Sequence, residues 1–146
     1  METTTVFRDP PGSDPRIEAV LLPPQARMGA LPRHFGPLSI TVENAVYDVM
    51  GRLCAQYHGD YWEFYELSNG GFYMAPVGAA QYRMVCVGNG YEGVLSADAA
   101  GLAVCAMAYS QLSFWRDGAR MADAYYLLRD YIAQHAERRA LLALLD

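Results

Sequence analysis

The sequence contains no lysine, and its strong bases are 11 arginines, which face 16 acidic residues for a formal net charge of −5. A polybasic surface able to hold DNA phosphates is therefore disfavoured, and we expect no tight DNA binding. The chain also lacks a run of roughly 18 apolar residues that could span a bilayer. Its first residues lack the basic and apolar regions of a signal peptide, so we expect a cytoplasmic protein without membrane contact.

Cysteine and histidine are scarce and scattered. The three cysteines, Cys54, Cys86 and Cys105, are far apart in apolar surroundings, which favours buried free thiols over a disulfide or a metal site. None of the three histidines stands in a pattern such as HExxH. We therefore expect no metal and no cofactor.

What is present is typical of a single globular domain. The chain has 146 residues, of which 53% are hydrophobic and 18% are charged, enough for one core of ordinary size. The charge is unevenly distributed, because residues 41–98 hold seven acids and two arginines. This stretch accounts for the whole net charge of −5, while the nine acids and nine arginines of the flanks cancel.

The centre of the chain predicts a first β-hairpin. Residues 61–67 and 72–76 are rich in aromatic side chains and are separated by Ser68-Asn69-Gly70-Gly71. Asn and Gly tolerate the positive φ angles of a type I′ turn, so an Asn-Gly pair between such segments is a strong hairpin signal.

A second hairpin follows directly. Residues 81–87 and 91–95 flank Gly88-Asn89-Gly90, which repeats the same turn chemistry. Two hairpins in succession predict a four-stranded antiparallel sheet.

Helical patterns lie on both sides of these hairpins. Apolar residues at spacings of three and four predict a helix over 42–57, with Thr41 as its N-cap. Ser96 is placed to cap a second helix, which is apolar nearly all round and therefore buried. A third helix after Gly118 and a short terminal helix after His135 complete the pattern. The predicted class is α+β, a single domain with about four helices packed on the sheet.

Residues 1–30 are expected to form a partly disordered tail ahead of a domain over 31–146. Residues 1–16 are rich in proline and threonine and have little apolar content. Residues 17–22 fit either a short strand or a helical turn, and Pro23 ends it in both cases.

The stretch Leu31-Pro32-Arg33-His34-Phe35-Gly36-Pro37 holds two prolines and a glycine. These breakers predict an irregular loop. We expect Leu31 and Phe35 to hold it against the core.

Patterns for catalysis are missing. Gly88-Asn89-Gly90 lacks the strand-to-helix context of a phosphate loop, and no serine has a G-x-S-x-G elbow around it. Glu63 and Glu66 would point to opposite faces of a strand and cannot flank one bond. We therefore predict no catalytic residues and no enzyme, although a triad can still assemble in space.

The strand over 61–67 would carry large aromatic side chains on both faces. One face holds Trp62, Phe64 and Glu66, and the other holds Tyr61, Glu63, Tyr65 and Leu67. Two interpretations of the second face stay open. It is partly covered, with tyrosine hydroxyls reaching water, or it meets a partner, since aromatic residues are enriched at interfaces.

Five motifs together resemble the ArdB/KlcA family of antirestriction proteins. In chain order they are residues 31–36, Tyr61-Trp62-Glu63-Phe64-Tyr65-Glu66-Leu67-Ser68-Asn69-Gly70-Gly71-Phe72-Tyr73-Met74-Ala75-Pro76, Gly88-Asn89-Gly90-Tyr91-Glu92-Gly93, Ser96-Ala97-Asp98-Ala99-Ala100-Gly101 and Leu128-Arg129-Asp130-Tyr131. The resemblance covers roughly residues 31–146. The first 30 residues have no counterpart, and His135-Ala136 stands where relatives often have His-Pro.

The resemblance implies an α+β fold and a protein of plasmids and other mobile elements that relieves the host's type I restriction of incoming DNA. It leaves the roles of single residues open. We hypothesise that Tyr61, Glu63, Tyr65 and the Asn69-Gly70 turn contact the type I restriction-modification complex or an associated host factor. The alternative is a small regulatory or adaptor protein acting in plasmid maintenance or gene expression.

Charge limits the mechanism. A duplex carries one negative charge per about 1.7 Å, so a mimic about 30 Å long needs on the order of 18. The chain has 16 acids, offset by 11 arginines. Extensive DNA mimicry is therefore a poor fit, and we expect protein-protein interference by a monomer or weak homodimer.

Overall fold

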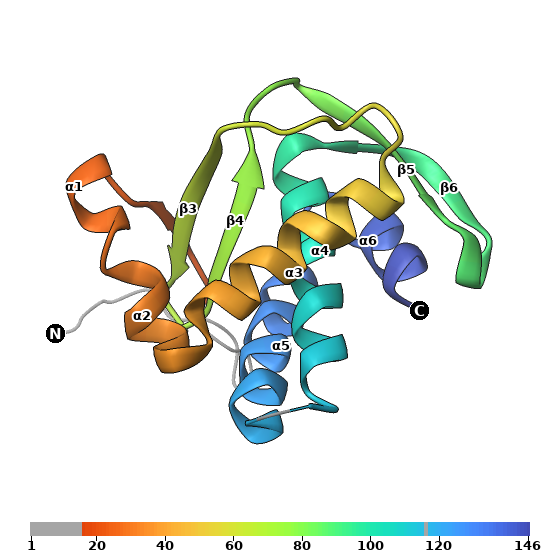
Figure 1. The fold of residues 1–146 in the computed structure, drawn as a ribbon. Coiled ribbons are helices and arrows are strands. Elements are labelled where there is room, and N and C mark those ends of the chain that lie inside the picture. The colour runs from red at the N-terminus through yellow and green to blue at the C-terminus, as the bar shows by residue number, and fades with distance from the viewer. Residues whose placement is uncertain (1–15, 116) are drawn as a thin grey trace, which may run out of the picture.

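The computed structural model describes residues 16–115 and 117–146 (Figure 1). The elements are, in chain order, β2 (Ala19–Leu21), α1 (Pro24–Arg27), α2 (Ala30–Phe35), the 3₁₀ turn η1 (Gly36–Leu38), α3 (Ser39–Leu53), β3 (Trp62–Leu67), β4 (Phe72–Pro76), β5 (Gln81–Cys86), the 3₁₀ turn η2 (Val87–Asn89), β6 (Tyr91–Ser96), α4 (Ala97–Leu112), α5 (Gly118–Ile132) and α6 (Arg138–Leu145). The α+β class is confirmed, with α3 to α6 as the longer helices. None of the described helices is long and apolar enough to cross a membrane.

The strands form two separate sheets. Both predicted hairpins are present, β3 with β4 and β5 with β6. The single four-stranded sheet was wrong, because β2, β3 and β4 form one antiparallel sheet and β5 and β6 form another. Figure 1 shows the β5–β6 hairpin reaching away from β3 and β4.

The edge of β4 that does not pair with β3 explains this separation, because side chains of α4 occupy it. The carbonyl oxygen of Phe72 accepts a hydrogen bond of 2.6 Å from the Tyr109 hydroxyl. The backbone N–H of Met74 donates to the Cys105 sulfur at 3.4 Å. Pro76 has no N–H to offer. A further strand could not pair with this edge while α4 lies against it.

Gly101 allows α4 to lie this close. A Cβ atom at this position would stand 2.5 Å from the carbonyl oxygen of Met74 and 2.6 Å from the Cα atom of Ala75, which is inside contact distance. The helix is buried nearly all round, as predicted. Ser96 is its N-cap, also as predicted, and accepts a hydrogen bond of 3.1 Å from the N–H of Ala99.

The stretch 31–37 is helical, so the predicted loop was wrong. Pro32 falls within the first turn of α2, where a missing N–H costs no helical hydrogen bond. Gly36 then ends the helix with φ 54°. The expected anchoring is confirmed, since Leu31 and Phe35 are buried. The Phe35 ring lies 5.3 Å from that of Tyr109.

Helix α3 begins and ends earlier than the predicted 42–57. It starts at Ser39, whose hydroxyl donates to the carbonyl of Gly36 at 2.6 Å, so Thr41 is not the cap. The periodicity was read correctly, because its apolar positions are buried: Val42, Val46, Val49, Met50 and Leu53. The later helices also bury apolar side chains of one face: Met121, Leu128 and Ile132 of α5, and Leu141 and Leu144 of α6.

The structured part of the chain starts before residue 31. Residues 1–15 of the predicted tail lie outside the described residues. Residues 19–21 form β2, which pairs with β3, so the strand alternative for this region is confirmed. The amide of Gln134 holds the N–H and the carbonyl of Ile17 at 3.0 and 2.6 Å.

The first hairpin turn differs from the predicted type I′. Among the described residues, Asp117 is the one non-glycine residue with positive φ, so Asn69 does not adopt it. Gly70 does, with φ 96°, and its N–H donates to the carbonyl of Leu67. This pattern is a type I turn closed by a glycine bulge.

All three cysteines are free, as predicted, with Cys54 and Cys105 buried and Cys86 half-buried.

Candidate functional site

The sheet β2-β3-β4 has one side that helices cover only in part. Along β3, Trp62 and Phe64 are buried, while Glu63 and Tyr65 alternate with them and are half-buried. Tyr61, just before the strand, keeps 60% of its side chain exposed. The strand therefore places Glu63 and Tyr65 on one side, which we call the open side. The ring of Tyr61 lies 4.8 Å from the Arg27 guanidinium, which also packs on Phe64 of the other side at 4.1 Å, so Tyr61 is not grouped with them.

A stack of tyrosines forms the floor of the open side. The ring of Tyr65 lies 4.9 Å from that of Tyr73 on β4 and is nearly parallel to it. Tyr73 stacks in turn on Tyr131 of α5 at 6.1 Å. The Tyr65 hydroxyl donates to Glu63 at 3.2 Å. Burial, and then the Glu63 carboxylate, raise the pKa of Tyr65 to about 12, so it remains a neutral donor.

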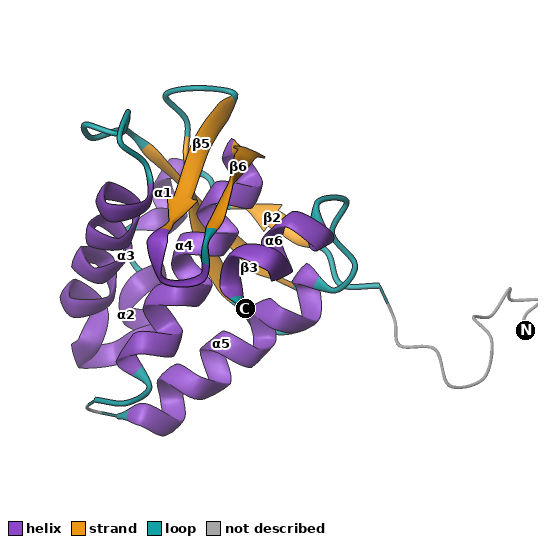
Figure 2. Ribbon diagram, turned by 90° about the vertical axis from the view of Figure 1, so that its right-hand side faces the viewer, coloured by secondary structure: helices purple, strands orange, loops and turns teal. Residues whose placement is uncertain are grey.

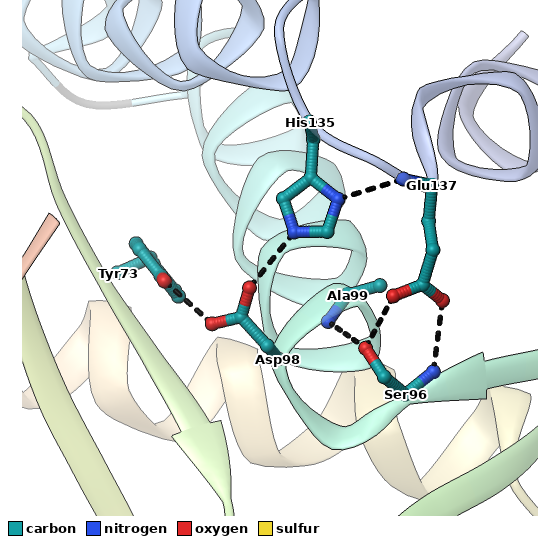
Figure 3. Close-up of polar contacts among 6 residues, drawn as sticks. All are labelled: Tyr73, Ser96, Asp98, Ala99, His135 and Glu137. Carbon is teal, nitrogen blue, oxygen red and sulfur yellow. Dashed lines mark hydrogen bonds and ion pairs between the residues drawn. The ribbon is translucent and has the colours of Figure 1, made fainter. Parts of the chain in front are cut away.

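A chain of polar contacts continues from this stack toward the helix ends (Figure 3). The buried hydroxyl of Tyr73 donates to Asp98 Oδ1 at 2.6 Å, and His135 Nε2 lies 2.8 Å from Asp98 Oδ2. Asp98 stands in the first turn of α4, and His135 in the connection between α5 and α6. Burial alone would raise the pKa of Asp98, but hydrogen bonds from His135 and Tyr73 outweigh it and hold that pKa below its ordinary value.

The contacts of His135 define what its ring can do. Its Nδ1 accepts a hydrogen bond of 3.0 Å from the N–H of Glu137. A neutral imidazole has one donor and one acceptor, so Nε2 carries the proton that it donates to Asp98. Both nitrogens are thus occupied by the protein, and the Asp98–His135 pair fixes helix ends and does not offer a free base.

Glu137 completes the connection between α6 and α4 (Figure 3). Its carboxylate accepts from the N–H of Ser96 at 3.0 Å and from the Ser96 hydroxyl at 2.5 Å. The sequence predicted Ser96 as a cap but missed both partners of this junction, Glu137 and His135. Each lies about 40 positions from the residue that it binds, and no local pattern marks such a pair.

The predicted Asn69-Gly70 turn lies at the far end of β3 from Tyr61. The amide nitrogen of Asn69 donates to the carbonyl of Leu127 at 3.0 Å, and its oxygen accepts from the N–H of Gly71 at 2.9 Å. The amide nitrogen therefore attaches the turn to α5, and the oxygen holds the turn itself together. Its backbone shape, more than its amide, is what the turn can present to a partner.

The covered side of β3 carries a second polar cluster. Glu66 binds Arg33 and lies 2.6 Å from Nε2 of His34, both from α2. The hydrogen bond from Arg33 is the main reason why the pKa of Glu66 lies below its ordinary value. Glu66 thus points away from Glu63, as the strand periodicity predicted, and no carboxylate pair forms between them.

Two grooves lie around Arg16 and Ile17, just before β2. One, of about 630 Å³, is lined by Arg16, Ile17, Ser68, Asn69, Asp130, Ala133 and Gln134. The other, of about 500 Å³, is lined by Arg16, Ile17, Glu18, Ala19, Tyr131, Gln134, His135 and Ala136. The polar side chains of Ser68, Asn69 and Gln134 hold backbone groups of the protein. Across residues 16–115 and 117–146, no group of three or more His, Cys, Asp or Glu side chains could hold a metal ion.

Fold and site together define an α+β protein whose buried polar groups fasten a sheet to helix ends. Comparison with known proteins then gives the family. The family model for antirestriction proteins matches residues 55–146. The chain belongs to the antirestriction protein family, which confirms the resemblance seen in its motifs.

Individual relatives agree with this assignment. One KlcA antirestriction protein of Escherichia coli is 44% identical over 127 residues, which cover 82% of this chain and 87% of the relative. A second KlcA of Escherichia coli is 41% identical and covers 91% and 97%. A solved structure of the KlcA and ArdB proteins superimposes with a TM-score of 0.84 at 39% identity, over 92% of this chain and 98% of that one. Those two proteins show a novel fold and antirestriction activity against type I DNA restriction systems in vivo but not in vitro.

Proposed function

We propose that this chain relieves the type I restriction of DNA that enters a bacterial host on a plasmid or other mobile element. Membership of the antirestriction family and the in vivo activity of KlcA and ArdB support this proposal. The protein acts in the cytoplasm, where incoming DNA is cut, as a monomer or weak homodimer.

The mechanism is interference by protein contact. The number of acids is too small for extensive DNA mimicry, and arginines neutralise several of them in ion pairs: Arg33–Glu66, Arg83–Glu92, Arg120–Asp117 and Arg129–Asp146. A catalytic role has little support either, because both ring nitrogens of His135 are already occupied.

The contact surface is the open side of β3, with Glu63 and Tyr65, bounded by Tyr61 before the strand and by the turn at Asn69-Gly70. The observation that carries this assignment is the half-buried Glu63–Tyr65 pair on the part of the sheet that helices leave uncovered, with the largely exposed Tyr61 at the start of the strand. Aromatic rings with polar edges are the side chains that interfaces favour. A six-residue strand extends this surface over about 20 Å. The partner is the type I restriction-modification complex or a host factor associated with it.

The test is a double replacement, Glu63→Ala with Tyr65→Phe, which removes the carboxylate and the hydroxyl but keeps the ring stacked on Tyr73. Plating of unmodified phage is compared in a type I restricting host that expresses the wild type or the variant. We expect the variant to lose restriction relief and to keep its melting temperature. The matched control is Glu92→Ala, an exposed acid on the other sheet, which should keep full relief.

Two outcomes overturn parts of the proposal separately. Full relief by the folded double variant eliminates this surface as the point of contact. A plating effect of the wild type that persists in a host without a type I system eliminates antirestriction and favours the regulatory or adaptor alternative.

A further inference from the structure

A half-buried arginine lies over two aromatic rings between α1 and the start of β3. Cζ of Arg27, the last residue of α1, lies 4.1 Å from the ring centre of Phe64 and 4.8 Å from that of Tyr61. Figure 1 shows α1 beside β3. A guanidinium stacks on a ring through its flat face, and its N–H donors lie in the plane of the group. The two rings therefore hold Arg27 in place without using its donors.

Arg27 has no acidic partner among the residues that the structure describes. Across residues 16–115 and 117–146, no carboxylate comes within ion-pair distance of its guanidinium, and none of its N–H groups donates to another residue. Arg33, on the next helix, pairs with Glu66 instead. Charged side chains that are partly buried are ordinarily paired. The unpaired state of Arg27 therefore points to an anionic group that comes from outside this part of the chain.

A groove of about 390 Å³ opens beside this arginine. Its walls come from α1, α2, α3 and β3 and consist of Pro24, Arg27, Met28, Leu31, Glu43 and Phe64. Met28 is 90% exposed and forms an apolar rim. The groove thus combines an unpaired cation with apolar side chains that can cover a small hydrophobic group.

Glu43 is the acid of this groove, and Tyr47 already binds it. The hydroxyl of Tyr47 donates to Glu43 Oε2 at 2.9 Å, and Glu43 makes no ion pair with Arg27. Its charge opposes a dense row of negative charges, such as DNA phosphates that follow one another every 1.7 Å or so along a duplex. A single carboxylate in a polypeptide suits the groove better, because backbone N–H donors accompany it and can face Glu43.

The groove is separate from the open side of β3. Phe64 alternates with Glu63 and Tyr65 along the strand, so its ring points to the opposite side. A partner that binds Arg27 therefore uses a different surface from the one that we propose for the restriction complex.

We propose that Arg27 binds the carboxylate of an Asp or Glu side chain in a partner protein, and that an apolar residue next to this acid packs in the groove against Met28 and Phe64. A guanidinium can hold a carboxylate through two parallel hydrogen bonds. Arginine is typical of the residues that dominate interfaces, and one that is already held by two rings loses little freedom on binding. The inference goes beyond restriction relief and does not depend on it.

The experiment selects binding sequences without assuming a partner. The purified full chain is panned against a phage library of random short peptides, each fused at its C-terminus to the coat protein, so that their carboxylates come from Asp and Glu side chains. The best peptide is then synthesised with an amidated C-terminus, and its affinity is measured for the wild type and for Arg27→Met. This replacement keeps an apolar stem over the rings and removes the charge. Arg33→Gln, at an exposed arginine that is already paired, is the matched control.

We expect the selected peptides to carry Asp or Glu beside an apolar residue. Binding should be weaker by about tenfold or more for Arg27→Met and unchanged for Arg33→Gln, since a hydrogen-bonded ion pair is lost in the first variant alone. Replacing the acid of the peptide by its amide should weaken binding to the wild type as much, and this arm requires no change in the protein. The NMR signal of the Met28 methyl group should shift when the peptide binds. Melting temperatures of the two variants check that both remain folded.

Several results would each overturn the proposal. They are selection of neutral or basic peptides, selection of none, equal affinity of the wild type and Arg27→Met, equal affinity of the acid and amide peptides, and shifts at Tyr65 in place of Met28. Displacement of the peptide by a DNA duplex would assign the groove to nucleic acid, and self-association that Arg27→Met abolishes would assign it to a second copy of the chain. The plating test uses cells and this one uses purified protein, so the failure of either leaves the other standing.

Discussion

The two hairpins use the same turn chemistry but differ in their surroundings. In each turn an asparagine oxygen accepts the N–H two residues ahead, Asn69 from Gly71 at 2.9 Å and Asn89 from Tyr91 at 3.0 Å. In each, the amide nitrogen donates to the carbonyl of a helix residue. Asn69 donates to Leu127 at 3.0 Å, and Asn89 donates to Leu144 of α6 at 2.6 Å. Local sequence therefore makes equivalent turns in both places.

What differs is the cover on the strands. All five residues of β4 are buried, with β3 along one edge and α4 along the other. In β5, buried and exposed residues alternate, and the outward face carries the Arg83–Glu92 ion pair. Figure 2 shows β5 and β6 at the periphery of the helical layer. The comparison teaches that turn residues specify a hairpin, while the neighbours of its edges decide which sheet it joins.

The largest expected effect comes from pushing α4 off β4. Gly101→Val places a branched side chain where even a Cβ would stand 2.5 Å from the carbonyl of Met74. We expect the free energy of unfolding to fall by about 3 kcal/mol or more, measured by urea denaturation. The control is Gly88→Ala in the second hairpin, where a Cβ meets nothing within 4 Å and the loss should stay within about 0.5 kcal/mol. Equal losses at both positions would remove the contrast between the hairpins.

A smaller loss should follow when the edge of β4 loses a hydrogen bond. Tyr109→Phe leaves the carbonyl of Phe72 buried without its 2.6 Å donor, at a cost of about 2 kcal/mol. Tyr126→Phe removes the hydroxyl of an exposed tyrosine and should cost almost nothing. Thermal melting of the two variants tests the difference. Identical melting temperatures would show that the carbonyl of Phe72 finds another hydrogen-bond donor.

Acid should weaken the attachment of β4 to the start of α4. The pKa of Asp98 is lowered in the folded protein, so its contribution is present above the ordinary value of 3.8 and is lost as the pH falls through the lowered value. Asp98→Asn should therefore be less stable than the wild type by about 1.5 kcal/mol at pH 6. We expect this difference in the free energy of unfolding to become smaller between about pH 4 and pH 2. Urea denaturation of both proteins at each end of this range measures it, and a difference that grows in acid would contradict the prediction.

The smallest expected effect comes from replacing the asparagine of each hairpin turn. Asn69→Ala and Asn89→Ala each remove an oxygen that accepts the N–H two residues ahead and an amide nitrogen that donates to a helix, but Asn69 is half-buried whereas Asn89 is exposed. We expect losses of about 1 kcal/mol for Asn69→Ala and about 0.5 kcal/mol for Asn89→Ala. Urea titrations in parallel measure both, and a larger loss at Asn89 would reverse the ranking.

Most of the fold could be predicted where the signal is local. Both hairpins, the Ser96 cap and the buried face of α3 follow from neighbouring residues. The division of the sheet could not be predicted, because Cys105 and Tyr109, which occupy the edge of β4, lie 31 and 37 residues from the groups they bind. The helix over 30–35 was missed because Pro32 was interpreted as a residue that ends a helix, whereas it lies in the first turn of one.

The same distinction applies to the candidate site. Strand alternation was enough to group Glu63 and Tyr65 on one side, but it does not hold for Tyr61, which precedes the strand and contacts Arg27 together with Phe64. The contacts of Tyr73 and His135 with Asp98 join three distant parts of the chain, and no spacing in the sequence links them. The turn type was also misjudged, since an Asn-Gly pair fits both a type I′ turn and a type I turn with a glycine bulge.

The measurement that tests the central claim most directly is the plating efficiency of unmodified phage on a type I restricting host that expresses the Glu63→Ala, Tyr65→Phe variant. If the open side of β3 makes the contact, plating should fall to the level of cells without the protein, while the variant stays folded. Plating equal to that of the wild type would contradict the account.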